Sequence, residues 1–316
     1  MQNHPLKTQN YNSLVTLASG ASVGVAFLLI TIKSYAWLET GSSGVLVSLI
    51  DSSIDALSSV INFIVLRYAL APADEEHRFG HGKAESIASL GQAAFIFGSA
   101  GFLILHASQK LLHPQIIEKA GLGINIIAIS LVITLALVVF QKYIIKKTQS
   151  PAIQGDSFHY SSDLLMNLAV IAGLFVSQQS FPQADPIIAL IVGFYILYNA
   201  FQLANKSIHS LLDRELDIVT QQVIGNIALA QPKVLGLHDL RTRDSGKTIF
   251  IQMHLEMDDH ITLLEAHGIA DAIEAEVLKR FPNADIIVHQ DPISAVDRNI
   301  IVPFEKATPD TAEVEK

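Results

Sequence analysis

The stretch SLIDSSIDALSSVINFIVLR, residues 48–67, places two carboxylates, Asp51 and Asp55, one helical turn apart inside a long apolar run. A second apolar run opens with His159 and Asp163 at the same i, i+4 spacing. Side chains at this spacing lie on one face of a helix. Ionisable groups within a membrane-spanning helix are costly, and they usually mark an ion or substrate pathway. The two runs therefore predict helices that turn their polar faces away from lipid and toward each other.

The composition predicts a membrane protein with a soluble part. Half of the 316 residues are hydrophobic and only 16% are charged, with a mean hydropathy of +0.39, whereas soluble domains carry about 25% charged residues. A helix that crosses a bilayer needs about 20 apolar residues. Six stretches are long enough, and we predict that all are transmembrane helices: 14–38, 44–71, 85–112, 121–147, 157–178 and 184–205.

Basic residues predict the orientation. Nine lie at the N-terminus, in the second and fourth connections or after the sixth stretch: Lys7, Arg67, Arg78, Lys83, Lys142, Lys146, Lys147, Lys206 and Arg214. Three lie toward the other side: Lys33, Lys110 and Lys119. Cytoplasmic connections are enriched in Lys and Arg, so both termini are expected in the cytoplasm. We expect Lys33, near the outer end of its helix, to extend toward the interface.

The remaining sequence predicts a small α+β domain with the order α-β-β-α-β and its helices on one sheet face. Its expected elements are a helix at 217–231, strands at 234–243 and 248–257, a helix at 262–281 and a strand at 284–290. The second strand alternates, with Ile249, Ile251, Met253, Leu255 and Met257 on the core face and Phe250, Gln252, His254 and Glu256 on the other. The predicted organisation is a transmembrane domain at 1–206, a linker at 207–216, a soluble domain at 217–293 and a disordered tail at 294–316.

The four polar groups of the membrane stretches suit a metal ion. The chain has no cysteine, so a metal must be held by His, Asp, Glu or backbone oxygen. Asp51, Asp55, His159 and Asp163 offer three carboxylates and one imidazole, and imidazole favours zinc and similar metals over magnesium or calcium. The carboxylates would also bind protons when the metal is absent, so metal and protons compete for the same atoms. The net charge of −9 argues against nucleic-acid binding.

A second candidate site lies in the connection after the second apolar stretch. Asp74, His77 and His81 could hold a metal with water as a fourth ligand. The alternative is a solvated loop, because Glu75, Glu76 and Arg78 are interleaved with these residues.

The soluble domain offers further candidate ligands. His289 and Asp291 lie two apart on a predicted strand and therefore share a face. His238 and His254 lie on the other two predicted strands, and His267 lies on the predicted helix between strands. Each of these histidines taken alone could equally be a solvated side chain.

Together these motifs resemble the cation diffusion facilitator family, most closely its bacterial zinc and iron efflux branch, which includes ferrous-iron efflux pumps. The resemblance covers residues 12–292 and is carried by Asp51-x-x-x-Asp55, His159-x-x-x-Asp163, His81-Gly82-Lys83-Ala84-Glu85, His238-Asp239-Leu240-Arg241 and His289-Gln290-Asp291. It implies a homodimeric antiporter in the bacterial inner membrane that exports Zn(II), and often Cd(II) or Fe(II), in exchange for protons.

The same resemblance assigns roles to the three groups of residues. It implies that the membrane quartet is the transport site and that Asp74, His77 and His81 form a loop-borne zinc site. It also implies a metallochaperone-like cytosolic domain with a binuclear zinc site at the dimer contact. The ligands implied for that site are His238, His254, His267, His289 and Asp291, with Asp291 as a bridge.

Other function classes are less well supported by the residues. An intramembrane metallohydrolase is not expected, because the chain has no H-E-x-x-H motif and four protein ligands leave no position for a catalytic water. A passive channel is disfavoured, because tight ligation in mid-membrane opposes rapid conduction. The sequence thus predicts a non-enzymatic antiporter that works by alternating access, with a membrane metal sensor signalling through its cytosolic domain as the alternative.

Overall fold

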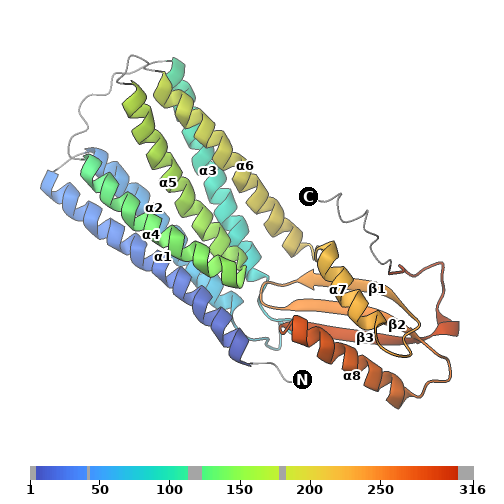
Figure 1. Ribbon diagram of the computed structural model, residues 1–316. Helices are drawn as coiled ribbons and strands as arrows, with labels where there is room; N and C mark the ends of the chain where they lie inside the picture. The colour runs from blue at the N-terminus through green and yellow to red at the C-terminus, as the bar shows by residue number, and fades with distance from the viewer. Residues whose placement is uncertain (1–4, 41–42, 113–122, 178–182, 305–316) are drawn as a thin grey trace. The chain divides into compact units, whose positions relative to one another are not determined.

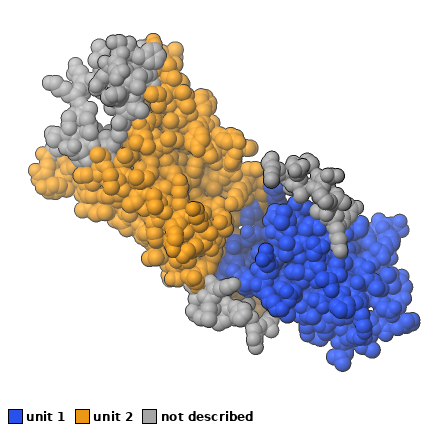
Figure 2. Space-filling view, viewed as in Figure 1, with its two compact units in different colours: residues 1–9, 210–316 blue, residues 10–209 orange. Residues whose placement is uncertain are grey.

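The computed structural model describes residues 5–40, 43–112, 123–177 and 183–304 (Figure 1). The chain divides into two compact units, which are coloured separately in Figure 2. One unit comprises residues 10–209, and the other comprises residues 1–9 and 210–316. The predicted tail beyond residue 304 lies outside the described residues.

The first unit contains the six predicted helices. They are α1 (Pro5–Thr40), α2 (Ser43–Ala69), α3 (Ala84–Leu112), α4 (Gly123–Thr148), α5 (Pro151–Ser177) and α6 (Ala184–Leu211). Within the described residues, five of them, α1, α2, α3, α4 and α6, contain spans that are long and apolar enough to cross a membrane. The predicted helix at 157–178 is confirmed as α5, which begins earlier, at Pro151.

Apolar packing holds these helices together in separate clusters. One cluster joins α1, α2, α4 and α5 through residues such as Val15, Leu66, Ile144 and Ile153. Another joins α3 to α6 through Ile96, Ala100, Ile196 and Ala200. Large apolar side chains also face outward, as with Phe102, which is 73% exposed. Such an outer surface is suited to lipid rather than water.

The second unit has the predicted α-β-β-α-β order. Its elements are α7 (Ile218–Leu229), β1 (Gly236–Asp244), β2 (Ile249–Met257), α8 (Leu263–Arg280), β3 (Ala284–Pro292) and the short 3₁₀ helix η1 (Ile293–Ala295). The three-stranded sheet has the order β1-β2-β3, with β1 and β2 antiparallel and β2 and β3 parallel. A parallel pair needs a long crossover connection, and α8 provides it.

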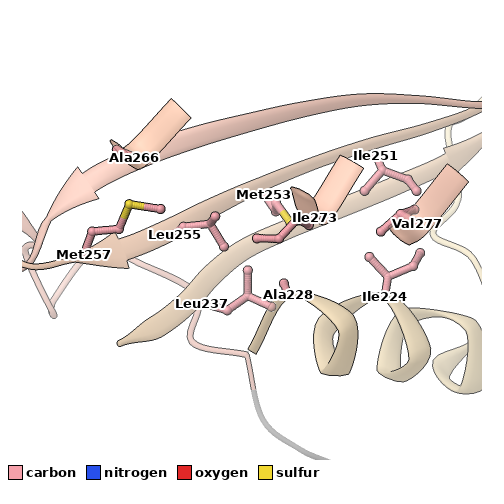
Figure 3. Packing of buried hydrophobic residues seen from close by; sticks show 10 residues of the cluster. All are labelled: Ile224, Ala228, Leu237, Ile251, Met253, Leu255, Met257, Ala266, Ile273 and Val277. Carbon is pink, nitrogen blue, oxygen red and sulfur yellow. The ribbon is translucent and has the colours of Figure 1, made fainter. Parts of the chain in front are cut away.

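One face of the sheet carries the core. The odd-numbered side chains of β2, including Ile251 and Met253, meet Ile224 of α7 and Ile273 and Val277 of α8 (Figure 3). This arrangement confirms the predicted alternation of β2 and places both helices on the same face. The even-numbered side chains of β2 are therefore left for the opposite face.

Three predicted boundaries differ most from the structure. Helix α1 begins at Pro5, ahead of the predicted stretch at 14–38. Helix α6 continues to Leu211, so it takes up the first half of the predicted linker at 207–216. The tail was predicted to be disordered over 294–316, but residues 293–304, which we call the C-terminal strap, begin with η1 and pair with β1 at residues 302–304. A β-bridge joins His238 to Pro303, and Phe304 packs against the domain core. The open edge of β1 supplies backbone partners that the polar, aperiodic sequence does not reveal.

Candidate metal sites

The membrane unit brings three of the four predicted ligands together. The Nε2 atom of His159 lies 3.2 Å from Oδ1 of Asp55 and 3.7 Å from Oδ2 of Asp163. The three ligand atoms lie within 4.8 Å of one another. Zinc binds nitrogen and oxygen ligands at about 2.0–2.2 Å, so ligands of one tetrahedral ion lie roughly 3.3 Å apart. The observed spacing fits a single small divalent cation.

Two polar atoms of this group lack hydrogen-bond partners in the described part of the chain. Among the described residues, Nε2 of His159 and Oδ2 of Asp163 are buried and have no hydrogen-bond partner. Asn62 lies two turns after Asp55 on the same helix face. Both atoms of its side-chain amide group are also buried and have no hydrogen-bond partner among the described residues. Buried polar groups are normally hydrogen-bonded, and each exception calls for an explanation such as an ion or water.

Asp51 lies one turn from this group and stands apart from it. Its side chain is exposed in the single chain, and it interacts electrostatically with Asp55 and His159 without joining the cluster of three. Asp51 therefore remains a predicted ligand that the geometry does not yet bring to the other three.

The predicted position of Lys33 at the membrane interface differs from the structure. It does not extend to the interface but is only 8% exposed, and its Nζ donates to Oγ of Ser52 at 2.6 Å and to the Ser48 carbonyl at 3.2 Å. Its charge interacts with Asp51, Asp55 and Asp163. A buried cation is tolerated when anions compensate it, so the carboxylates of the site explain why Lys33 turns inward.

A polar network missed by the sequence analysis supports the same helices. Asp156, one turn before His159, is fully buried, and its Oδ2 accepts from Ser22 Oγ at 2.5 Å and from Gln141 Nε2 at 2.8 Å. Tyr160 pairs with Ser59 of α2 at 2.8 Å. These bonds join α1, α4 and α2 to α5 and fix the rotation of the helix that carries His159. The i, i+3 spacing of Asp156 and His159 was a usable signal, because it places both on one face.

The loop between α2 and α3 gathers all three predicted ligands. Asp74 lies 3.3 Å from His77 Nδ1 and 3.2 Å from His81 Nε2, and the three ligand atoms fall within 4.8 Å. Asp74 Oδ1 accepts from the backbone N–H groups of His77 at 2.6 Å and of Glu76 at 3.1 Å. The His77 backbone hydrogen bond holds the pKa of the Asp74 carboxyl below its ordinary value. Gly80, with φ +80°, makes the turn that returns the chain to His81.

The soluble unit places three histidines in one row across the sheet. His238 of β1 pairs in register with His254 of β2, which pairs with His289 of β3. Two residues along, Glu256 pairs with Asp291, so all these side chains share the face opposite the core. Register partners in neighbouring strands lie about 5 Å apart at Cβ, which brings separate segments of sequence to one place.

Asp291 lies at the centre of this row. Its Oδ2 is 2.8 Å from His254 Nδ1 and 3.4 Å from His238 Nε2, while its Oδ1 is 3.0 Å from His289 Nε2. A carboxylate that reaches three imidazoles through both oxygens has the donor set of a bridging metal ligand. His267 is not part of the group: it lies on α8, which packs on the core face, and pairs with Asp271 at 3.5 Å.

Comparison with known proteins shows which family the chain belongs to. The family model described as the cation efflux transmembrane domain matches residues 20–212, and the model described as the cation efflux protein, cytoplasmic domain, matches residues 216–293. The chain belongs to the cation diffusion facilitator family. It is therefore a cation efflux transporter and a multi-pass membrane protein.

Curated relatives extend this cation diffusion facilitator likeness over nearly the full length. The cation-efflux pump FieF of Shewanella oneidensis is 50% identical over 287 residues, which cover 91% of this chain and 97% of the relative. FieF of Klebsiella pneumoniae is 49% identical with 91% and 96% covered, and FieF of Salmonella choleraesuis is 47% identical with 92% and 97% covered. A solved structure of the zinc form of CzrB aligns with 27% of this chain and 99% of its own length, at 25% identity and a TM-score of 0.25.

Proposed function

We propose that this cation diffusion facilitator exports Zn(II) from the cytoplasm in exchange for protons, with Cd(II) and Fe(II) as further substrates. The observation that carries the proposal is the burial of His159 Nε2 and Asp163 Oδ2 beside Asp55, with no hydrogen-bond partner for either atom among the described residues. One imidazole and two carboxylates are ligands that zinc accepts, and related divalent metals share them. Asp51, one turn away, is proposed to complete the site when an ion draws it in.

Proton exchange follows from the charge of the same atoms. Carboxylates that are close together in a low dielectric repel one another, and either a proton or a metal ion relieves that repulsion. The metal can bind only where protons leave, so a cytosolic ion displaces protons and protons at the opposite side displace the ion. Alternating exposure of one site to the two sides turns this competition into antiport.

The soluble unit is proposed to be a cytosolic dimerisation domain that zinc occupies. His238, His254, His289 and Asp291 offer a group of nitrogen and oxygen donors on the sheet face opposite the core, and a second copy can approach it at His289, whose side chain is exposed. His267 would join them only after a rearrangement. The excess of basic residues in the predicted cytoplasmic connections supports two cytoplasmic termini in a bacterial inner membrane.

Flux in proteoliposomes tests the transport proposal. Vesicles that contain a zinc dye and a pH dye should show zinc entry coupled to opposite proton movement under an imposed pH gradient. Asp55→Asn should abolish both signals, because it removes a charged ligand while it keeps the shape of the side chain. Ser53→Ala is the matched control on the same helix, since Ser53 is exposed and its hydroxyl donates to the Leu49 carbonyl of the preceding turn.

The outcomes separate the rival functions. Zinc movement that survives in Asp55→Asn would remove the site from the transport pathway. Zinc binding by the wild-type protein with no flux would instead support a membrane metal sensor. Zinc movement without proton movement would contradict antiport.

A further inference from the structure

Glu256 is a buried carboxylate beside the row of histidines. Its side chain lies on the same sheet face as His254, and Glu256 is only 3% exposed. A Cβ atom on Gly236, its register partner in β1, would lie 2.6 Å from Oε2 of Glu256. The carboxylate therefore occupies space that is open because residue 236 has no side chain.

The C-terminal strap supplies the partner for this carboxylate. Arg298 donates from Nη1 to Oε1 of Glu256 at 2.8 Å and from Nη2 to Oε2 at 2.6 Å. Paired hydrogen bonds between a guanidinium and a carboxylate are strong and strict in geometry. Arg298 lies beyond residue 293, where the match to the cytoplasmic domain of the family ends. The family domain alone does not account for this contact.

Glu256 also contacts His238. Its Oε1 lies 3.3 Å from Nδ1 of His238, whose Nε2 faces Asp291 at 3.4 Å. An ionised carboxylate only accepts hydrogen bonds, so a hydrogen bond to it assigns the hydrogen of His238 to Nδ1. That tautomer leaves Nε2 with a free lone pair directed toward Asp291. A histidine that binds a metal commonly donates its other N–H to a carboxylate, which sets ring orientation and basicity.

The backbone of the strap keeps Arg298 in place. The Val302 carbonyl accepts from the Asp239 backbone N–H at 2.9 Å, and the Phe304 N–H donates to the Leu237 carbonyl at 3.1 Å. These bonds attach the strap on both sides of His238 in sequence. A displacement of the strap would therefore remove Arg298 from Glu256 and release the His238 ring.

We propose that Arg298 and Glu256 are positioning residues for the cytosolic metal site, and that the strap prepares His238 to bind zinc. The inference rests on the proposed zinc occupancy of the soluble unit. The order of contacts is Arg298 to Glu256, Glu256 to His238 Nδ1, and His238 Nε2 to the metal. The strap thereby becomes part of the site, although it supplies no ligand.

Zinc titration of the full-length protein in detergent tests this inference. Asp55→Asn and His81→Ala are first introduced together to weaken the other two candidate sites. In that background, Arg298→Gln should weaken zinc binding roughly 10- to 100-fold, the range for loss of such supporting partners. Arg298→Lys keeps the charge but not the paired geometry, so its zinc affinity should lie between those of the background protein and Arg298→Gln. Arg241→Gln is the matched control, since Arg241 lies on β1 but is exposed and 4.0 Å from its acidic neighbour Asp239.

A second readout separates positioning from general stability. In zinc-free protein labelled with ¹⁵N-histidine, the His238 signals should report hydrogen on Nδ1 and should change in Arg298→Gln and Glu256→Gln but not in Arg241→Gln. If Arg298→Gln fails to fold, the near-isosteric Glu256→Gln decides, with at least tenfold weaker binding expected. Unchanged affinity and unchanged His238 signals would overturn the inference. No zinc binding in the background protein would instead overturn the proposed cytosolic site itself.

Discussion

Asp217 shows how one side chain starts an element of the soluble unit. It is the N-cap of α7, and its carboxylate accepts from the Thr220 backbone N–H at 2.9 Å and from the Thr220 hydroxyl at 2.7 Å. These hydrogen bonds from Thr220 hold the pKa of Asp217 below its ordinary value of 3.8. The ionised form therefore favours the folded state. Its contribution is present above the ordinary pKa and is lost as the pH falls through the lower, folded value.

This cap gives a pH-dependent prediction. Asp217→Ala should lower the opening free energy of α7 by about 1 kcal/mol at pH 7, the usual loss for an N-cap. The loss should shrink as the pH falls below 3.8, where the carboxyl of the opened helix takes up a proton, and should vanish once the pH passes below the lower pKa of the folded state. Hydrogen exchange of the α7 amides between pH 3 and pH 7 measures both values. Asp217→Asn, an equally good cap that does not titrate, should match wild type at pH 7, and a loss that stays constant with pH would refute the argument.

Single residues also show what local sequence can and cannot predict. The pairs Asp51/Asp55 and His159/Asp163 were recognisable because helical spacing alone places each pair on one face. The inward position of Lys33 was not, because it depends on the Ser52 hydroxyl of another helix. When a side chain could reach either water or an internal acceptor, its tertiary neighbours decide which of the two it contacts.

Among the elements, α7 and the strap are fitted to each other at Gly225. A Cβ atom built on Gly225 would lie 2.1 Å from Cζ of Phe304. Ala favours a helix interior over Gly by about 1 kcal/mol, but an overpacked contact costs about 1–3 kcal/mol. The backbone of α7 therefore gives up helix propensity so that the ring of the strap can approach.

This fit predicts a change of sign in a double-mutant cycle. Gly225→Ala should destabilise the soluble unit by about 1–2 kcal/mol when Phe304 is present, because the clash exceeds the gain in propensity. In a Phe304→Ala background, the same change should stabilise it by up to about 1 kcal/mol. Denaturant unfolding of the soluble unit in the full-length protein, followed by hydrogen exchange of α7, gives both numbers. An effect of the same sign in the two backgrounds would show that Phe304 does not occupy this space.

Elements were predictable where periodicity is local. Length and hydropathy locate all six helices of the first unit, and the alternation of β2 identifies which side chains form the core. The strap escaped prediction, because residues 293–304 have no apolar period and gain their order from the edge of β1. The roles of Glu256 and Arg298 were missed for the same reason. The two residues are 42 apart in sequence, and only the tertiary fold brings them into contact. Cross-strand neighbours of a metal site follow from tertiary pairing, not from spacing along the chain.

For the whole molecule, charge balance limits the exchange that the membrane site can perform. Three ionised carboxylates carry a charge of −3, and one Zn(II) or two protons each reduce it to −1. A site that keeps its charge in both forms avoids a change in the cost of burial when the helices rearrange. We therefore expect two protons for each zinc ion, with Lys33 as a fixed charge in both forms.

The expected exchange fixes the zinc gradient that the protein can sustain. One pH unit is worth about 1.36 kcal/mol per proton, so two protons per zinc should hold about a hundredfold zinc gradient at equilibrium. The measurement is the final zinc ratio in proteoliposomes whose pH difference is one unit, with the membrane potential clamped by potassium and valinomycin.

Because two protons balance the charge of one zinc ion, changing the clamp by 100 mV should leave that ratio unchanged. Exchange of one proton per zinc would hold only about a tenfold gradient and would move one net charge, worth about 2.3 kcal/mol per 100 mV, so a strong dependence on potential would contradict the charge-balance argument. Asp55→Asn vesicles should show no gradient under either clamp.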